Sequence, residues 1–189
     1  MISVFCGGDN LKRQLALFDM IGNVMSIIAG ALLILGAFMP WVGMALKGMS
    51  VGGKKIADGE KTVINLFQFT NDGHVILKIA GGIIVAAGIT LLVFGLFSML
   101  EKRLIHLAFI KLAASGGGLV GIMIALTSSS IKKENEMVKE LLTAVPDLAV
   151  KLTPWGKILS IIAVIVMIIA DVFCAICMMK RQSLKNRRR

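Results

Sequence analysis

Residues 75–127 read VILKIAGGIIVAAGITLLVFGLFSMLEKRLIHLAFIKLAASGGGLVGIMIALT, two long apolar runs joined by one short charged connection. An apolar run of about 18 residues or more predicts a helix that spans a lipid bilayer. Because the connection is so short, the two helices must fold back on each other as a tight antiparallel pair. Runs of the same kind occupy residues 21–42 and 158–179. The sequence therefore predicts an all-α membrane protein, a four-transmembrane-helix bundle with spans at about 21–42, 75–100, 104–127 and 158–179.

Little of the chain lies outside these spans. Of its 189 residues, 57% are hydrophobic and 17% are charged, whereas about 25% are charged in a typical soluble domain. The loops and tails are too short to form a separate domain of ordinary size. We expect residues 1–19 to form a cytoplasmic N-terminal segment, as an interfacial helix, residues 20–179 the transmembrane domain, and residues 180–189 a basic cytoplasmic tail.

The positive charge is concentrated at the C-terminus, although the net charge of the whole chain is +10. A basic cluster directly after a span marks its cytoplasmic end and binds the head groups of anionic lipids. No aromatic platform accompanies the cluster, so nucleic acid is not an expected partner. The residues expected at lipid head groups are Lys180, Arg181, Lys185, Arg187, Arg188 and Arg189.

The distribution of Lys and Arg also predicts the orientation of the spans. The terminal segments and the connection near Lys102 are short and basic, so both termini are expected in the cytoplasm. The long connections, residues 43–73 and 128–156, then lie outside. Trp41 and Trp155 flank these connections and are predicted interface anchors. With no tyrosine, no glycosylation sequon and a short chain, we expect a bacterial cytoplasmic membrane protein.

The two long connections contain different structural signals. Residues 62–70, TVINLFQFT, are rich in β-branched and aromatic residues, and Gly52-Gly53 is a turn signal. We predict a short strand or small β-hairpin there, with an interfacial helix as the alternative. Residues 131–142 have the pattern of an amphipathic helix, with Ser128 among its candidate N-caps and Pro146 at its end. This helix would either lie along the membrane surface or bind a partner.

Small residues recur in all four predicted spans at intervals of four or seven. Such stripes let helix backbones approach each other closely in a membrane. We expect them to pack the bundle internally, with packing against a second copy as the alternative. The predicted helix-packing residues are Gly22, Ser26, Gly30, Gly81, Gly88, Gly95, Ala113, Gly117 and Gly121.

Two charged residues lie inside the predicted spans. Lys111 and Asp171 are each about 10–12 Å from the cytoplasmic end of their span at the usual rise per residue. An isolated charge at mid-membrane costs at least about 2.5–3.5 kcal/mol. We therefore predict that Lys111 and Asp171 face each other within the bundle. The pair either fixes which helices are neighbours or forms a step on a polar path, to which His106 and Asn23 would contribute.

Signatures of enzymes are absent. The two histidines, His74 and His106, lie at opposite ends of predicted spans and cannot share a metal, and no catalytic or phosphate-binding motif occurs. We expect no catalytic residues, no metal and no cofactor. Cys174 and Cys177 have C-x-x-C spacing, but no second pair lies near them, so we interpret them as small apolar residues of a helix face. Acylation near the basic tail is an alternative.

The order of long, short and long connections, with both termini inside, is similar to the topology of tetraspan proteins such as claudins. The claudin outer loop carries a Trp and a pair of Cys, and residues 43–73 contain neither. The run GAFMPWV at 36–42, followed by a glycine-rich loop, also resembles small bacterial membrane proteins. These resemblances imply topology only, and they give no activity.

The leading functional hypothesis is therefore a non-catalytic integral membrane protein that acts by association. It would be an accessory, scaffold or immunity-type component whose outer connections meet a membrane or extracytoplasmic protein. The alternative is an oligomeric ion channel or membrane-permeabilising pore that uses the Lys111/Asp171 pair. A small transporter is a third hypothesis, although transporters built from inverted repeats are usually longer.

Overall fold

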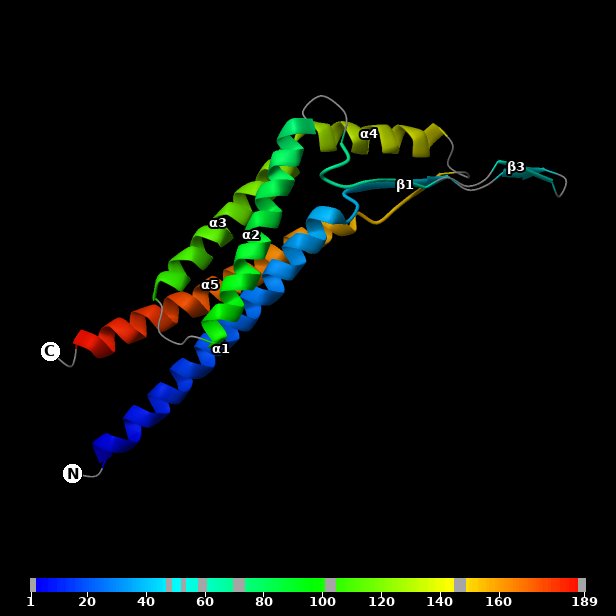
Figure 1. The fold of residues 1–189 in the computed structure, drawn as a ribbon. Helices are drawn as coiled ribbons and strands as arrows, with labels where there is room; N and C mark the ends of the chain where they lie inside the picture. Colours follow the sequence, from blue (N-terminus) through cyan, green and yellow to red (C-terminus); the bar gives the residue numbers. More distant parts are fainter. Residues whose placement is uncertain are drawn as a thin grey trace.

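The computed structural model describes residues 3–46, 49–51, 54–57, 61–69, 74–100, 105–144 and 149–186. Side chains are described for residues 13–45, 61–69, 75–100, 107–144 and 150–180. The chain is mostly helical, with a small sheet at one end of a helical bundle (Figure 1). The helices are α1 (Ser3–Phe38), α2 (His74–Leu100), α3 (Ile105–Thr127), α4 (Ser129–Ala144) and α5 (Trp155–Asn186). The strands are β1 (Val42–Leu46), β2 (Met49–Val51), β3 (Lys54–Ala57), β4 (Lys61–Ile64) and β5 (Ala149–Lys151).

The four predicted long apolar helices are confirmed. Within the described residues, α1, α2, α3 and α5 each contain a stretch long and apolar enough to cross a membrane. The boundaries of the first differ from the prediction, because α1 already begins at Ser3 and includes the expected interfacial segment. It ends at Phe38, before Pro40, since a proline disfavours helical geometry in the residue that precedes it. Val42, expected inside the span, begins β1 instead.

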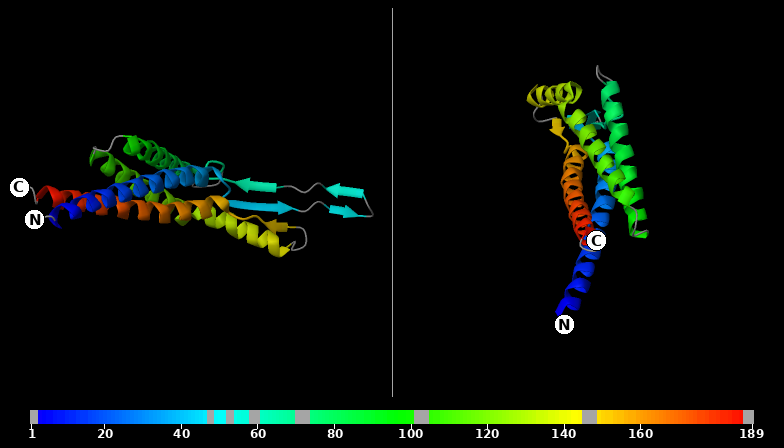
Figure 2. Two further views of the ribbon diagram at one scale, coloured as in Figure 1. Left: turned by 90° about the horizontal axis from the view of Figure 1, so that it is seen from below. Right: turned by 90° about the vertical axis from the view of Figure 1, so that its left-hand side faces the viewer.

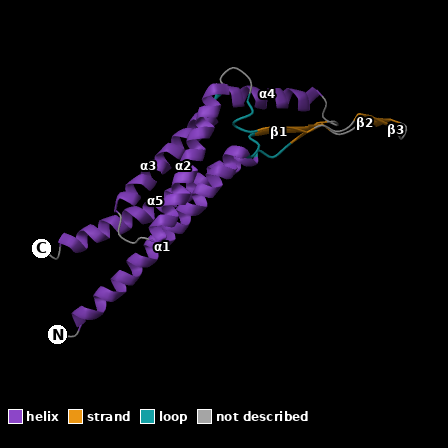
Figure 3. Cartoon of the chain, in the orientation of Figure 1, coloured by secondary structure: helices purple, strands orange, loops and turns teal. Residues whose placement is uncertain are grey.

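The helices of the bundle pack in the order α5, α1, α2, α3. Each of these three neighbouring pairs is in contact along much of its length, whereas α3 and α5 touch over only a short stretch. The two termini lie at one end of the bundle, and the sheet with α4 lies at the other (Figures 1 and 3). We call these the termini end and the sheet end. The bundle is therefore closed along three helix pairs and only partly closed along the fourth.

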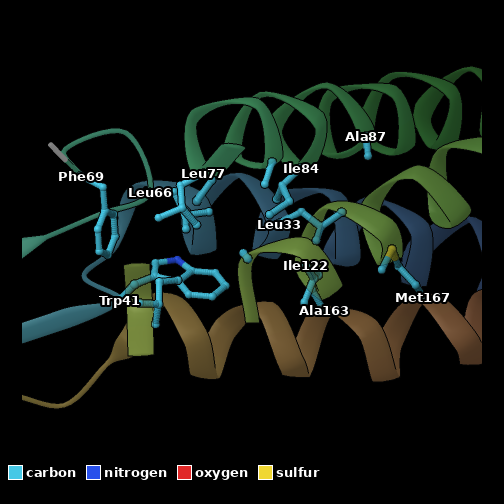
Figure 4. Packing of buried hydrophobic residues seen from close by; sticks show 14 of the residues in the cluster. Leu33, Trp41, Leu66, Phe69, Leu77, Ile84, Ala87, Ile122, Ala163 and Met167 are labelled. Carbon is cyan, nitrogen blue, oxygen red and sulfur yellow. The ribbon is translucent and has the colours of Figure 1, made fainter. Parts of the chain in front are cut away.

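The core runs through the bundle and continues into the loops at the sheet end (Figure 4). Leu33 of α1 and Ile84 of α2 are fully buried in the middle of the bundle. Leu66 and Phe69, from the loop after β4, are buried beside Trp41. One continuous apolar core thus connects the helices to the base of the sheet.

The four strands β1 to β4 form one long antiparallel hairpin, which we call the β arm. β1 pairs with β4 at its base, β2 pairs with β3 further out, and β5 joins the other side of β1. Figure 2 shows the β2–β3 part projecting beyond every helix. The sheet at the base therefore has the order β4-β1-β5, with β4 at one edge.

The expected strand over residues 62–70 is only partly present. β4 ends at Ile64, and the backbone N–H of Phe67 donates to the Asn65 side-chain oxygen at 3.0 Å. The N–H of Gln68 also donates to the Asn65 carbonyl at 3.1 Å. An asparagine side chain that bonds to the backbone two residues later favours a turn over a strand. This turn brings Leu66 and Phe69 into the core.

The predicted amphipathic helix is present as α4. Its N-terminus is capped by Ser128, whose hydroxyl accepts from the Ser130 N–H at 3.3 Å. Ile131 and Val138 are buried, and α4 packs mainly over β1 and β5. The apolar face of α4 therefore covers one face of the sheet.

Candidate functional site

A cluster of polar side chains connects α1, α3 and α5 inside the bundle. The Lys111 ammonium donates to Asn23 Oδ1 at 2.6 Å, and the two residues are 6% and 3% exposed. The short distance is typical of a hydrogen bond from a charged donor. Lys111, on α3, is thereby held to α1, which packs on both α5 and α2.

The second contact of this cluster joins α3 to α5. Ser115 Oγ donates to Asp171 Oδ1 at 3.2 Å. Ser115 lies one helical turn after Lys111, so both side chains lie on the same face of α3. The Lys111 ammonium also acts electrostatically on the Asp171 carboxylate. Lys111 and Asp171 thus belong to one cluster, but Lys111 is hydrogen-bonded to Asn23 and Asp171 to Ser115.

No ion pair within 4.0 Å joins Lys111 and Asp171 in the described part of the chain. The two side chains were predicted to face each other directly. Instead, the Lys111 ammonium donates its hydrogen bond to Asn23 Oδ1. Ser115 was not among the predicted site residues. Its spacing of four from Lys111 is the sequence signal that could have identified it.

The cluster lies at the seam where α3 and α5 are only loosely packed. Asp171 is half-buried there, whereas Lys111, Asn23 and Ser115 are buried. A half-buried carboxylate beside a buried ammonium can neutralise that charge, or it can provide a site for a cation that moves along the seam. These are the two chemical roles available to the cluster.

The remaining predicted polar and interface residues have different surroundings. The side chain of His106 lies outside the described residues, as do those of Arg181, Lys185, Arg187, Arg188 and Arg189. Lys180 places its ammonium over the Phe18 ring, 5.5 Å from the centroid. Trp155 is 55% exposed. The Cys177 thiol is buried and lies 3.8 Å from the Leu15 carbonyl oxygen, and Cys174 is half-buried.

Trp41 is not at the surface, in contrast to the predicted interface anchor. It is 1% exposed, and its indole N–H donates to the Gly36 carbonyl at 2.8 Å. A Cβ on Gly156 would lie 2.5 Å from the Trp41 ring, so this glycine is required for the contact. The sequence did not identify Gly36 or Gly156. Trp41 joins α1 to the start of α5 at the sheet end.

Six of the nine predicted helix-packing residues are buried within the bundle. Gly30 and Gly88 bring α1 and α2 together, since a Cβ on Gly30 would lie 2.5 Å from the Gly88 carbonyl oxygen. Gly95 also packs on α1, Gly22 lies against α5, and Ser26 is buried and donates to the Gly22 carbonyl at 2.9 Å. Gly121 packs between α3 and α2.

The other three predicted packing residues have different roles. Gly81 packs against the Phe67 ring of the loop after β4. Ala113 is exposed, and a Cβ on Gly117 would meet no atom within 4 Å, so the expected internal packing of these two is wrong. Four residues rotate a helix by about 40° more than one turn, so a stripe at that interval drifts off the contact face. Gly118 packs in its place, against Leu33, Ala87 and Met167.

The base of the β arm carries an apolar pocket between the sheet and α4. Its volume is about 90 Å³. The exposed apolar side chains at its rim are Met137 and Leu141, which are 50% and 39% exposed. It is lined by Val42, Gly43, Met44, Thr62, Ile64, Glu134, Met137, Val138 and Leu141. The pocket could take one apolar side chain or part of an aliphatic chain.

Within the described residues, no three His, Cys, Asp or Glu side chains form a group that could hold a metal ion. No protein-family model matches the chain. A comparison with the curated proteins also gives no match. The candidate sites are therefore defined by their geometry alone, as a polar cluster in the bundle and a β arm at the sheet end.

Proposed function

We propose that the chain is a non-catalytic integral membrane protein that binds a partner protein through its β arm. The bundle would anchor it in a bacterial cytoplasmic membrane with both termini in the cytoplasm. The arm and α4 would then stand on the outer side, where a membrane or extracytoplasmic protein can reach them. The role fits an accessory, scaffold or immunity-type component.

The observation that carries this proposal is the projection of β2 and β3 beyond the bundle (Figure 2). They pair with each other, and no other described element packs on either of them to a comparable extent. A two-stranded ribbon is at best marginally stable alone in water. A partner that packs on the ribbon would supply the missing contacts.

Site-specific photo-crosslinking in native membranes tests the proposal. A photoreactive amino acid is placed at Ser50 of β2, and the matched control is placed at Val120 of α3, which is 55% exposed on the bundle surface. We expect a discrete protein adduct from Ser50 and none of the same mass from Val120. The absence of any protein adduct from Ser50 would contradict the proposal.

A channel or pore is the second candidate, because the polar cluster lies at the loosely packed α3–α5 seam. A cation path along this seam would pass the half-buried Asp171. Purified protein in liposomes should then conduct ions, and Asp171→Asn should change the conductance. Liposomes that stay tight at high protein density would exclude this candidate.

A further inference from the structure

Two residues of β4 direct their backbone N–H and C=O groups away from the sheet. The Leu152 N–H donates to the Gly43 carbonyl at 3.0 Å, so Gly43 directs its polar backbone groups toward β5. Because these groups alternate along an antiparallel strand, Val42 and Met44 direct theirs toward β4.

Ile64 and Thr62, the partners of Val42 and Met44, therefore point their backbone groups inward. The Trp41 N–H donates to the Ile64 carbonyl at 2.9 Å, in agreement with this assignment. Lys61 and Val63 alternate with them and direct their N–H and C=O groups away from β1. Among the described strands, β4 pairs with β1 alone. This outer side of β4 is the open edge.

The two faces beside the open edge differ in chemistry. Thr62 and Ile64 line the apolar pocket, with Met137 and Leu141 of α4 exposed at its rim. Side chains alternate between faces along a strand, so Lys61 and Val63 lie on the opposite face, where both are exposed. A strand added to this edge would place every second side chain beside the pocket and the others beside Lys61.

The charge along this side of the arm distinguishes between two kinds of added strand. Lys61 is the charged residue of β4, whose sequence is KTVI, and its side chain is exposed beside the open edge. A second copy that paired with the two Lys61 residues opposite each other would bring like charges together, which is destabilising. The side chains that line the pocket are mostly apolar, so an apolar side chain is favoured on the pocket face. The favoured strand is apolar on the pocket face and acidic on the Lys61 face.

We infer that the open edge of β4 binds an extended segment of a partner protein in which apolar and acidic residues alternate. The added strand pairs with the outward backbone groups of Lys61 and Val63, as in other complexes formed by strand addition. Its apolar side chains cover the pocket and its carboxylates lie near Lys61. This inference rests on the proposed function and specifies the chemistry of the partner. A lysine on an edge strand also discourages aggregation. That role does not account for the exposed apolar rim of the pocket, which a bound strand would cover.

Peptide binding to the purified full-length chain in nanodiscs tests the inference. The probe is a fluorescent ten-residue peptide of alternating valine and glutamate, and its control replaces each glutamate by lysine. We expect saturable binding of the valine–glutamate peptide and binding of the control that is weaker by roughly tenfold or more. The Lys61→Glu variant should reverse this preference. Equal binding of both peptides, or none of the valine–glutamate peptide, would overturn the inference.

A second pair of variants tests the backbone contact. Val63→Pro removes an N–H that points outward, and proline is tolerated on edge strands, whereas Val63→Thr keeps the N–H. Val63→Pro should abolish peptide binding and Val63→Thr should retain it, with the melting temperature unchanged in both. Equal peptide binding by the two variants would contradict strand addition.

The Ser50 adduct separates this inference from the proposed function. A protein adduct that forms equally well in Val63→Pro leaves association through the arm intact and overturns the open edge as its site. If the full chain is a dimer in detergent and Val63→Pro is a monomer, the open edge binds a second copy. That result would also overturn the inference of an acidic partner strand. Loss of the adduct in Val63→Pro, with no change of mass in detergent, is the expected result.

Discussion

The α1–α2 contact and the β arm differ in how their backbones are used. At Gly30 and Gly88 two helix backbones are so close that no side chain fits between them. At β4 the backbone groups of Lys61 and Val63 have no partner strand among the described elements. Close packing of the first kind contributes stability, and an open edge of the second kind is available for recognition. Substitutions should therefore separate the two properties.

The largest effect is expected from Gly30→Ala in the α1–α2 contact. The new Cβ would lie 2.5 Å from the Gly88 carbonyl oxygen and 2.9 Å from the Leu92 nitrogen, both backbone atoms that cannot move aside alone. Overpacking of this kind should lower the free energy of unfolding by about 3 kcal/mol, as measured by SDS titration of the purified protein.

Gly117→Ala is the matched control, because its Cβ would meet no atom within 4 Å. Alanine forms helices better than glycine by about 1 kcal/mol, so this variant should be neutral or more stable. Equal losses of stability in Gly30→Ala and Gly117→Ala would contradict close backbone packing between α1 and α2 at Gly30.

A smaller effect is expected in the polar cluster. Lys111→Met and Asn23→Leu each remove one side of the hydrogen bond of 2.6 Å. A double-mutant cycle of the two should give a coupling energy of about 1–2 kcal/mol, since the bond involves a charged donor. The same SDS titration measures it. A coupling near zero would mean that Asn23 does not hold the Lys111 ammonium.

A still smaller effect is expected from Trp41→Phe at the sheet end. Phenylalanine keeps most of the buried ring but removes the N–H that donates to the Gly36 carbonyl. The loss should be about 1 kcal/mol, the usual net contribution of one buried hydrogen bond. A matched substitution, Trp155→Phe, alters an exposed ring and should change the melting temperature less. A larger loss of stability in Trp155→Phe than in Trp41→Phe would contradict the role given to the hydrogen bond of Trp41.

The long apolar helices and α4 could be predicted because their signals are local. Length and composition identify the first, and the pattern of residues 131–142 identifies the second. The strand β1 was missed because Val42 and its neighbours extend the apolar run of α1. β4 ends at Ile64 because the Asn65 side chain accepts a hydrogen bond from the Phe67 N–H, and such bonds compete with strand formation. The strand propensity of residues 62–70 does not reveal this bond.

The candidate sites were predictable to different degrees. The depths of Lys111 and Asp171 placed them at the same level, but only the packing of α1 brings Asn23 against the ammonium. The buried face of α3 follows an interval of seven, through Lys111, Gly118 and Ala125, and an interval of four led instead to Gly117. The open edge depends on pairing between β1 and β4, strands that lie 14 residues apart along the chain.

The most direct test of the central claim removes the outer part of the arm. Residues 46–60 are replaced by Asn-Gly, a two-residue turn that joins the paired Ala45 and Lys61. The partner identified by the Ser50 adduct is then quantified after purification of this variant and of the full chain, in parallel with SDS titration. We predict that less of the partner is recovered, because the contacts of β2 and β3 are removed while the open edge of β4 remains, and that the free energy of unfolding changes by less than about 0.5 kcal/mol. Recovery of the partner at the level of the full chain would contradict a contribution of β2 and β3 to binding.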